Sequence, residues 1–349
     1  NWKKSMRWSD HDLSWGRPLK SILCLFDASI VPFHFYHLQS TNKIFLGGPY
    51  DEKSFVVKNA THYFTLLKDK KIILDHEERK KIILSNLKTI FAKSKCENNP
   101  DPSLVEEVTN LVEYPTALKG KFSEDFLALP EELLNLTMKQ HQRYFPMRSI
   151  DEGKIINQFI TISNNKDEKK LIIEGNERVL QARLADAKFF WDKNKKQNLV
   201  KLVSKLNGIV FYKDLGTVYD KTQRVRQLSS LIADIIVCNK EDTEIAASIC
   251  KADLVTDLVG EYPELQGIIG SYFALGQGFS PEISKAISDH YLPLGPNDRV
   301  PKEKIAICVA IADKLDTLIG FFGINVKPTS SKDPFALRRA VLGIIRILI

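Results

Sequence analysis

The chain has 349 residues, which suggests two domains, and its 44% hydrophobic and 27% charged residues are typical of globular proteins and exclude extended disorder. The net charge of +7, with an isoelectric point near 8.9, is compatible with RNA binding but does not establish it. No uninterrupted apolar run reaches about 18 residues, so no transmembrane helix is expected. The five cysteines are scattered without a CxxC spacing, which argues against a zinc ribbon or a disulfide frame and indicates a reducing compartment, here expected to be the cytoplasm.

The first part of the chain predicts a mixture of strands and helices. Two short apolar or alternating runs around Asp27-Ala28 predict a pair of strands. Pro130 is predicted to begin a helix, because acids follow it in the first turn, where the helix macrodipole favours them. Helical spacing is also found at residues 59–67, 75–91 and 104–112.

Two further strands are predicted at residues 144–149 and 157–163, separated by a turn at residues 151–153. The sequence HQRYF, at residues 141–145, mixes basic and aromatic side chains. That combination suits the stacking of nucleic-acid bases. Short motifs of this kind often mislead, so an edge strand with ordinary alternation is the favoured interpretation.

A polar, charged connector at residues 164–170 contains neither Gly nor Pro, and we place a domain boundary there. The predicted fold class is α+β multidomain: a mixed α/β module over residues 1–165 and an all-helical domain over residues 166–349. In the first helix after the connector, Leu180, Leu184, Ala187 and Trp191 share one face. Further helices are predicted at roughly residues 221–237, 243–258, 281–290, 302–322 and from 333 onward.

The predicted helix at 302–322 places acids among apolar residues. Ile305, Val309 and Ala312 share one side, with Asp316 in the middle of that side and Asp313 at its edge. A carboxylate in such a position costs several kcal/mol unless it is paired or ligated. Two interpretations remain open: two salt-bridged acids on a core helix, or a metal or recognition site.

The last predicted helix is amphipathic. Asp333 is predicted to be its N-cap and Pro334 its first residue. Arg338, Arg339 and Arg346 lie opposite an apolar stripe, and Lys332 adds a positive charge just before the helix. We predict that these four residues meet phosphate groups. A solvated face, or ion pairs between the arginines and the acids Asp313 and Asp316, are the alternatives. The apolar stripe consists of Leu337, Val341, Ile344 and Leu348.

Several long motifs follow one another along the whole chain. They include KSMRWSDHDLSWGRPLKSI at residues 4–22, GNERVLQARLADAKFF at 175–190, KADLVTDLVGEYPELQGIIG at 251–270 and ADKLDTLIGFFGINVKPTSSKDPFALRRAVLGIIRI at 312–347. In sequence and in order they resemble the β subunit of bacterial glycyl-tRNA synthetase, of the two-subunit type. Small departures occur at Gln277 and Ser330, where that family usually has Glu and Gly.

The resemblance implies a division of labour with a second chain. In this family a separate α subunit handles ATP, glycine and the aminoacyl adenylate, so ATP and Mg²⁺ are expected there, and this chain is expected to hold no cofactor and no catalytic residue. It would be the non-adenylating subunit of a glycine–tRNA ligase, which binds tRNA(Gly) and assembles as two α and two β chains. The phosphates met by Arg338, Arg339, Arg346 and Lys332 would then be those of tRNA(Gly). The absence of a GxxxxGKS/T loop and of HIGH and KMSKS sequences agrees with this expectation.

The resemblance also carries expectations about architecture. Residues 1–165 would correspond to a module similar to the β3/β4-type module of the phenylalanyl-tRNA synthetase β subunit. The family's β subunit extends further at both ends, so the chain from Asn1 to Ile349 is expected to be an internal fragment without the anticodon-binding domain. A pure assembly platform without RNA contact is not distinguished from a tRNA-binding subunit by the sequence.

Positions in the helical part resemble the HD phosphohydrolase fold, in which two His and two Asp residues bind a divalent metal. The positions that resemble this fold are Lys221, Ala252, Asp253, His290 and Asp313, with Lys221 and Ala252 in place of the two His ligands. Neither an ammonium nor a methyl group can ligate a metal, so the resemblance implies a degenerate HD-like domain without metal. His290 is then most simply a helix-end histidine. The alternative function is an HD-type metal-dependent phosphohydrolase acting on nucleotides, which the missing ligands disfavour.

Overall fold

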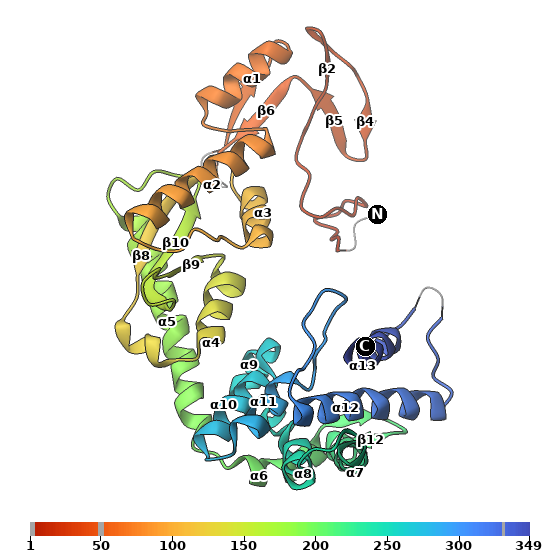
Figure 1. Ribbon diagram of the computed structural model, residues 1–349. Coiled ribbons are helices and arrows are strands. Elements are labelled where there is room, and N and C mark those ends of the chain that lie inside the picture. Colours follow the sequence, from red (N-terminus) through yellow and green to blue (C-terminus); the bar gives the residue numbers. More distant parts are fainter. Residues whose placement is uncertain (1–3, 48–51, 330–331) are drawn as a thin grey trace. The chain divides into compact units, whose positions relative to one another are not determined.

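The computed structural model describes residues 4–47, 52–329 and 332–349; Asn1 and Ser330 therefore lie outside the described residues. The chain separates into two compact units (Figure 1). The division differs from the boundary predicted after residue 165. The passage from the first unit to the second falls between residues 175 and 176, inside a helix, and residues 122–142 group with the helical unit. The first unit thus comprises the described residues up to 121 together with 143–175, and the second comprises 122–142 and 176–349.

Short strands begin the first unit. β2 and β3 form an antiparallel hairpin around Asp27, whose φ of 54° provides the left-handed turn conformation that Asp tolerates better than most residues. The predicted strand pair at this place is confirmed. β5 lies between β1, which is parallel to it, and β4, which is antiparallel, while β6 and β7 form a separate antiparallel pair. The strands are β1 (Ile22–Leu23), β2 (Leu25–Phe26), β3 (Ser29–Ile30), β4 (His34–Phe35), β5 (Leu38–Thr41), β6 (Lys43–Leu46) and β7 (Lys53–Val56).

Three helices follow, and each begins after a side chain that accepts a hydrogen bond from an amide of its first turn. The capping residues are Asn59, Asp75 and Asp101. The helices predicted at residues 59–67, 75–91 and 104–112 are confirmed by α1 (Ala60–Asp69), α2 (His76–Lys93) and α3 (Pro102–Leu111). Local signals sufficed here because caps and apolar spacing act within a few residues of each other.

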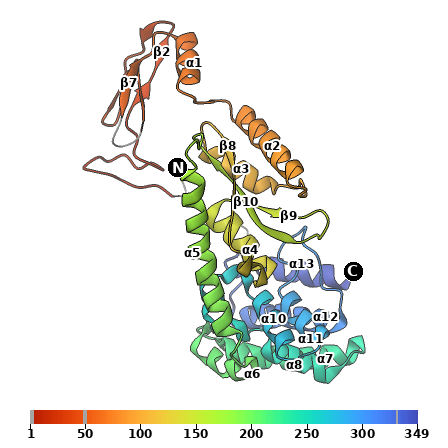
Figure 2. The ribbon, with the colours of Figure 1, turned by 90° about the vertical axis from the view of Figure 1, so that its left-hand side faces the viewer.

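An antiparallel sheet in the order β8-β10-β9 completes the first unit. Its strands are β8 (Thr116–Lys121), β9 (Phe145–Arg148) and β10 (Ile155–Ser163). Helices α2 and α3 pack against it, as Figures 1 and 2 show, and bury a common apolar core. The core includes Ile83, Leu87, Val105, Phe145 and Ile160.

The HQRYF sequence contributes Phe145 to this core. Tyr144 and Phe145 are buried, and the Tyr144 ring stacks on Phe159 with 4.6 Å between the ring centroids. Arg143 Nε donates to Glu107 Oε1 at 2.6 Å. Strand β9 lies at the edge of its sheet. The interpretation as an edge strand is therefore confirmed, and the two rings are not available for base stacking.

The second unit is mainly helical. Its helices are α4 (Glu131–Leu136), the greater part of α5 (Leu171–Asn194), α6 (Leu199–Leu202), α7 (Val218–Ile236), α8 (Lys240–Ile249), α9 (Asp257–Glu261), α10 (Ile268–Gly276), α11 (Pro281–Asp289), α12 (Lys304–Gly323) and α13 (Leu337–Leu348). Within the described ranges, no helix has both the length and the apolar character that crossing a membrane requires.

The prediction of an all-helical domain is wrong at one place. β11 (Val210–Tyr212) and β12 (Gly216–Thr217) form an antiparallel hairpin directly before α7. Gly216 adopts a φ of 79°, which turns the chain, and the Thr217 hydroxyl then caps α7 together with the Asp220 carboxylate. The hairpin is too short to show a periodicity in the sequence.

Two predicted helices have different bounds in the structure. Residues 243–258 form α8, a 3₁₀ turn at Ala252–Val255 and α9, because Thr256 caps a new helix and Asp253 bonds to a distant part of the chain. α13 begins at Leu337 rather than Pro334. The N-cap is Ala336, so the prediction of Asp333 as the N-cap is wrong, but the Asp333 carboxylate accepts from the amides of Leu337 and Arg338 at 2.9 and 3.0 Å.

Helix α12 forms the centre of the second unit. The predicted core positions Ile305, Val309 and Ala312 are all buried. It packs against α7, α8, α11 and α13, and Figure 1 shows it running beside these helices. Its buried acids therefore face neighbouring elements of the same unit.

Candidate functional site

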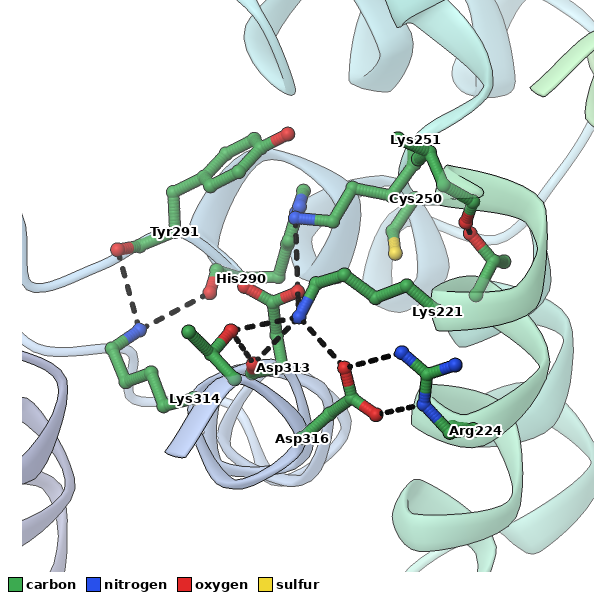
Figure 3. A network of polar contacts seen from close by, with 12 residues as sticks. Lys221, Arg224, Cys250, Lys251, His290, Tyr291, Asp313, Lys314 and Asp316 are labelled. Atoms are coloured by element: carbon green, nitrogen blue, oxygen red, sulfur yellow. Dashed lines mark hydrogen bonds and ion pairs between the residues drawn. The ribbon is translucent and has the colours of Figure 1, made fainter. Parts of the chain in front are cut away.

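A buried polar network joins α7, α12, the end of α11 and the turn after α8 (Figure 3). It brings together three of the predicted HD-like positions, Lys221, His290 and Asp313, and Asp253 lies beside it. Ala252 is fully buried and contributes only a methyl group. The tertiary structure thus gathers the HD-like positions in one place, although they are far apart in the sequence.

Lys221 is the central cation of the network. Its Nζ lies 3.3 Å from Asp313 Oδ1 and 3.1 Å from Asp316 Oδ2, and it donates to Thr317 Oγ1 at 2.8 Å. Arg224 completes the pairing of Asp316 through Nε at 2.5 Å and Nη2 at 3.3 Å. The Lys221 side chain is only 6% exposed. The interpretation of the two acids as salt-bridged residues on a core helix is confirmed.

Two further lysines belong to the network, and the sequence analysis did not identify them. Lys251 Nζ lies 3.0 Å from Asp313 Oδ1 and 3.8 Å from the centre of the Tyr291 ring. Lys314 Nζ donates to the backbone carbonyls of residues 290–292, with 2.6 Å to the Leu292 oxygen. One signal was present: Lys251 lies next to Ala252 and Lys314 next to Asp313, both assigned positions in largely apolar segments. Such a lysine must find acceptors in the core.

Asp253 and His290 are buried and only partly satisfied. Asp253 Oδ2 accepts from the amides of Gly267 and Gly270 at 2.6 and 3.0 Å, and His290 Nδ1 lies 2.7 Å from the Ile287 carbonyl oxygen. Asp253 Oδ1 and His290 Nε2 have no hydrogen-bond partner among the described residues. His290 is the C-cap of α11, which confirms the prediction of a helix-end histidine.

The charges of the network shift its protonation equilibria. Burial raises the pKa of Asp253 to about 6, and burial together with Lys251 lowers the pKa of His290 well below its usual value. Burial by itself would raise the pKa of Asp313, but Lys221 and Lys251 outweigh it and hold that pKa below its ordinary value. Burial lowers the pKa of Lys314 to about 8. At neutral pH the imidazole is neutral and Asp313 is charged.

The residues of the network do not fit a divalent metal. A metal needs several carboxylate, thiolate or neutral imidazole ligands, whereas here the ammonium groups of Lys221 and Lys251 contact the Asp313 carboxylate. In the part of the chain that the structure describes, no three His, Cys, Asp or Glu side chains are placed to hold a metal together. The lysines supply the positive charge that a metal would otherwise bring to Asp313.

The arginines predicted to meet tRNA bond to main-chain carbonyls of their own unit. Arg346 Nη1 donates to the Gly295 oxygen at 2.8 Å, and its Nη2 donates to the Asp298 oxygen. Arg339 donates to the Leu294 oxygen at 3.3 Å, and Arg338 donates to the Thr329 oxygen. The alternative of ion pairs with Asp313 and Asp316 is wrong, because those acids pair with α7 and with Lys251.

These arginines border an open groove between α13 and the loop that precedes α12. Arg338 and Arg339 are exposed, and Arg346 is half-buried. Lys332 is exposed and bonds through its backbone to Thr329. The groove has a volume of about 520 Å³, and Asp333, which accepts from the Leu337 amide, is the acid in its lining. The groove is therefore positively charged.

Comparison with known proteins identifies the family. A sequence model of the family described as "Glycyl-tRNA synthetase beta subunit" matches residues 1–349. The chain belongs to this family. The resemblance derived from the motifs is thereby confirmed.

Relatives named "Glycine--tRNA ligase beta subunit" come from several bacteria. The chain is 44% identical to that of Phenylobacterium zucineum over 355 residues, which cover 100% of this chain and 53% of the relative. It is 42% identical to that of Listeria monocytogenes and 43% identical to that of Geotalea uraniireducens, with 99% and 100% of this chain covered and 50% and 51% of the relatives. The chain spans about half the length of these curated relatives.

Gln277, where the resemblance predicts Glu in the family, has a structural role in this chain. Its Oε1 accepts from the Leu199 amide at 3.0 Å, and its Nε2 donates to the Gln197 oxygen at 2.8 Å. The side chain thereby joins the end of α10 to the start of α6. A glutamate at this position would retain the accepting contact and lose the donating one.

Proposed function

We propose that this chain supplies the tRNA-binding and assembly part of a glycine–tRNA ligase and works with a separate catalytic α subunit. The observation that carries the proposal is its membership in the glycyl-tRNA synthetase beta subunit family along all 349 residues. In the assembly, two α and two β chains combine, and the ligase acts in the cytoplasm. ATP, Mg²⁺ and glycine bind to the α subunit, while this chain holds tRNA(Gly) and directs its acceptor end to that site.

The helical unit is proposed to be a degenerate HD-like scaffold. Helices α7, α11 and α12 bring Lys221, His290 and Asp313 into one buried network, an arrangement that supports the HD-like assignment. Lysine ammonium groups neutralise Asp313 there, so the network is suited to holding helices together rather than to activating water. This argument favours a scaffold over a metal-dependent phosphohydrolase. The mixed first unit corresponds, in this proposal, to the β3/β4-type module of the phenylalanyl enzyme.

The tRNA contact is proposed at the positively charged groove of α13. Arg338 and Arg339 are exposed beside the groove, and each donates to a backbone carbonyl, at 3.3 Å for Arg339. A guanidinium group has five N–H donors, so donors remain for a phosphate. Arg346 and Lys332 complete the proposed contact, with Arg346 also fixing the loop that borders the groove.

The division of labour is tested by the exchange of pyrophosphate into ATP in the presence of glycine. The purified chain is assayed alone, the α subunit alone, and the two together, each with and without tRNA(Gly). We expect no glycine-dependent exchange by the chain alone, and charging of tRNA(Gly) only when both subunits are present. Glycine-dependent exchange by this chain without α would refute the proposal.

A further inference from the structure

Two cysteines from different elements of the second unit face each other. Cys238 Sγ and Cys308 Sγ are 3.6 Å apart. Cys238 follows the end of α7 and is half-buried, whereas Cys308 lies on α12 and is fully buried. Both thiols are free. A disulfide requires the sulfur atoms to approach to about 2.05 Å, so the two side chains must move closer together than in the reduced protein.

The surrounding contacts hold the pair in place. Val237, in the left-handed conformation with φ of 56°, ends α7, and the Cys238 amide donates to the Ala233 oxygen at 3.2 Å. Lys304, in the first turn of α12, donates to the Val237 oxygen at 3.1 Å. The corner between α7 and α8 is therefore tied to α12 beside Cys308. The two sulfur atoms face each other because the backbone on both sides is fixed.

We propose that Cys238 and Cys308 form a reversible disulfide when the protein meets a soluble disulfide such as oxidised glutathione. The Cys238 thiolate attacks one sulfur of the small disulfide, which forms a mixed disulfide and releases one thiol. Cys308 then loses its proton and attacks Cys238 Sγ, which releases the second thiol. Two protein thiols are oxidised to one disulfide, and one small disulfide is reduced to two thiols.

The order of the two steps follows from accessibility. Cys238 is half-buried and can meet a solute, whereas Cys308 is shielded and burial together with the adjacent thiol raises its pKa to about 12. Cys308 therefore reacts only with a partner already held at Cys238. The cross-link closes the chain between the end of α7 and α12, the two helices that carry Lys221, Arg224 and the acids Asp313 and Asp316. It would stabilise the packing of that pair against unfolding.

The test exposes the full chain to oxidised glutathione, followed by intact-mass analysis and a non-reducing peptide digest. We expect a species lighter by two hydrogen atoms, a linked peptide pair containing Cys238 and Cys308, and a higher midpoint of thermal unfolding that a reductant reverses. In Cys308→Ala the reaction should stop at a glutathione adduct on Cys238. In Cys238→Ser neither the adduct nor the cross-link should form at this place, and Cys308 should stay unmodified in the folded protein.

Cys24 provides the matched control, because it is also half-buried but lies in the first unit. Cys24→Ser should form the Cys238–Cys308 cross-link as the unaltered chain does. The proposal is overturned if the digest contains no peptide pair linking Cys238 to Cys308 under conditions in which Cys24 acquires glutathione. It is also overturned if glutathione modifies Cys308 in Cys238→Ser as fast as it oxidises Cys308 in the unaltered chain. Because Cys238→Ser changes a half-buried residue, this second arm does not depend on the folding of a core variant.

Discussion

Asp313 shows how a buried carboxylate is neutralised without a metal. Two lysine ammonium groups lie within 3.3 Å of its Oδ1, and both lysine side chains are buried. Removing charges from water costs several kcal/mol per ion, and only close pairing with further hydrogen bonds offsets that cost. The Asp313 backbone carbonyl and the Thr317 hydroxyl provide such bonds for Lys221. Removing one charged member of the network should therefore cost more stability than replacing all of its charged residues with apolar ones.

We predict that Lys221→Met destabilises the helical unit by about 3 kcal/mol, because Asp313 and Asp316 lose a shared partner in the core. The measurement is the urea dependence of far-UV circular dichroism. Lys240→Met is the matched control, because Lys240 pairs with Asp234 on the exposed surface. This substitution should lower the free energy of unfolding little or not at all. Equal midpoints for the two variants would contradict the assigned role of Lys221.

Asp253 should make stability depend on pH in the direction opposite to an ordinary ion-paired acid. Burial raises its pKa from 3.8 to about 6, so between these values the folded protein holds a proton that the unfolded chain has released. The contribution to stability is fully present below about pH 4 and is lost as the pH rises to about 6, with an upper size of about 3 kcal/mol.

The variant Asp253→Asn isolates this effect. Its amide oxygen can still accept from the Gly267 and Gly270 amides, but the side chain does not titrate. We expect the unfolding free energy of the variant, relative to the unaltered chain, to increase from about pH 4 to about pH 6 and to stay constant above. Parallel stability curves for the two proteins across this range would show that Asp253 has an ordinary pKa.

Helix α13 combines two roles that the sequence pattern does not separate. Its arginines bond to carbonyls of residues 294–298 and of Thr329, so they fix the loop before α12 and the segment before α13. Arg346 makes two such bonds and is half-buried, whereas Arg338 and Arg339 are exposed. We therefore expect Arg346 to contribute most to stability. Arg338 and Arg339 are the two that remain accessible to a phosphate.

We predict that Arg338→Ala with Arg339→Ala weakens tRNA(Gly) binding in the α–β complex with little change in the unfolding midpoint. Each lost phosphate contact should reduce the slope of log affinity against log salt by about one unit. Arg346→Ala is the contrasting variant, expected to lower the unfolding midpoint. Unchanged tRNA affinity and salt slope in the double variant would locate the RNA contact elsewhere.

At the scale of the whole molecule, the ligand chemistry predicts that the chain retains no stoichiometric divalent metal. After dialysis against Mn²⁺ or Zn²⁺ and then against buffer, elemental analysis should find well below one equivalent per chain. Ala252→His alone should not generate phosphohydrolase activity, because the Lys221 ammonium still occupies a ligand position beside Asp313. One equivalent of bound metal in the unaltered chain would mean that the ligand positions are misassigned.

Local chemistry allowed much of the architecture to be predicted. The caps Asn59, Asp75 and Asp101, and the apolar spacing after them, set the helices of the first unit to within a few residues. The helix predicted at residues 243–258 has different bounds because of a distant contact. Asp253 accepts from the Gly267 amide, and this bond interrupts a segment whose apolar spacing is helical. Helix propensity and spacing are short-range properties, and a contact with a remote amide does not appear in them.

The sequence by itself determined the family, because long motifs preserve their order along the whole chain, and it determined that Lys221 and Ala252 cannot ligate a metal. Only the tertiary structure decided which cations neutralise Asp313, since Lys251 is distant from it in sequence and reaches it through the packing of α8 and its following turn against α12. It also decided that the arginines of α13 bond to a loop. Ion pairs and hydrogen bonds form between atoms that folding brings within about 3 Å, and a one-dimensional pattern does not contain those distances.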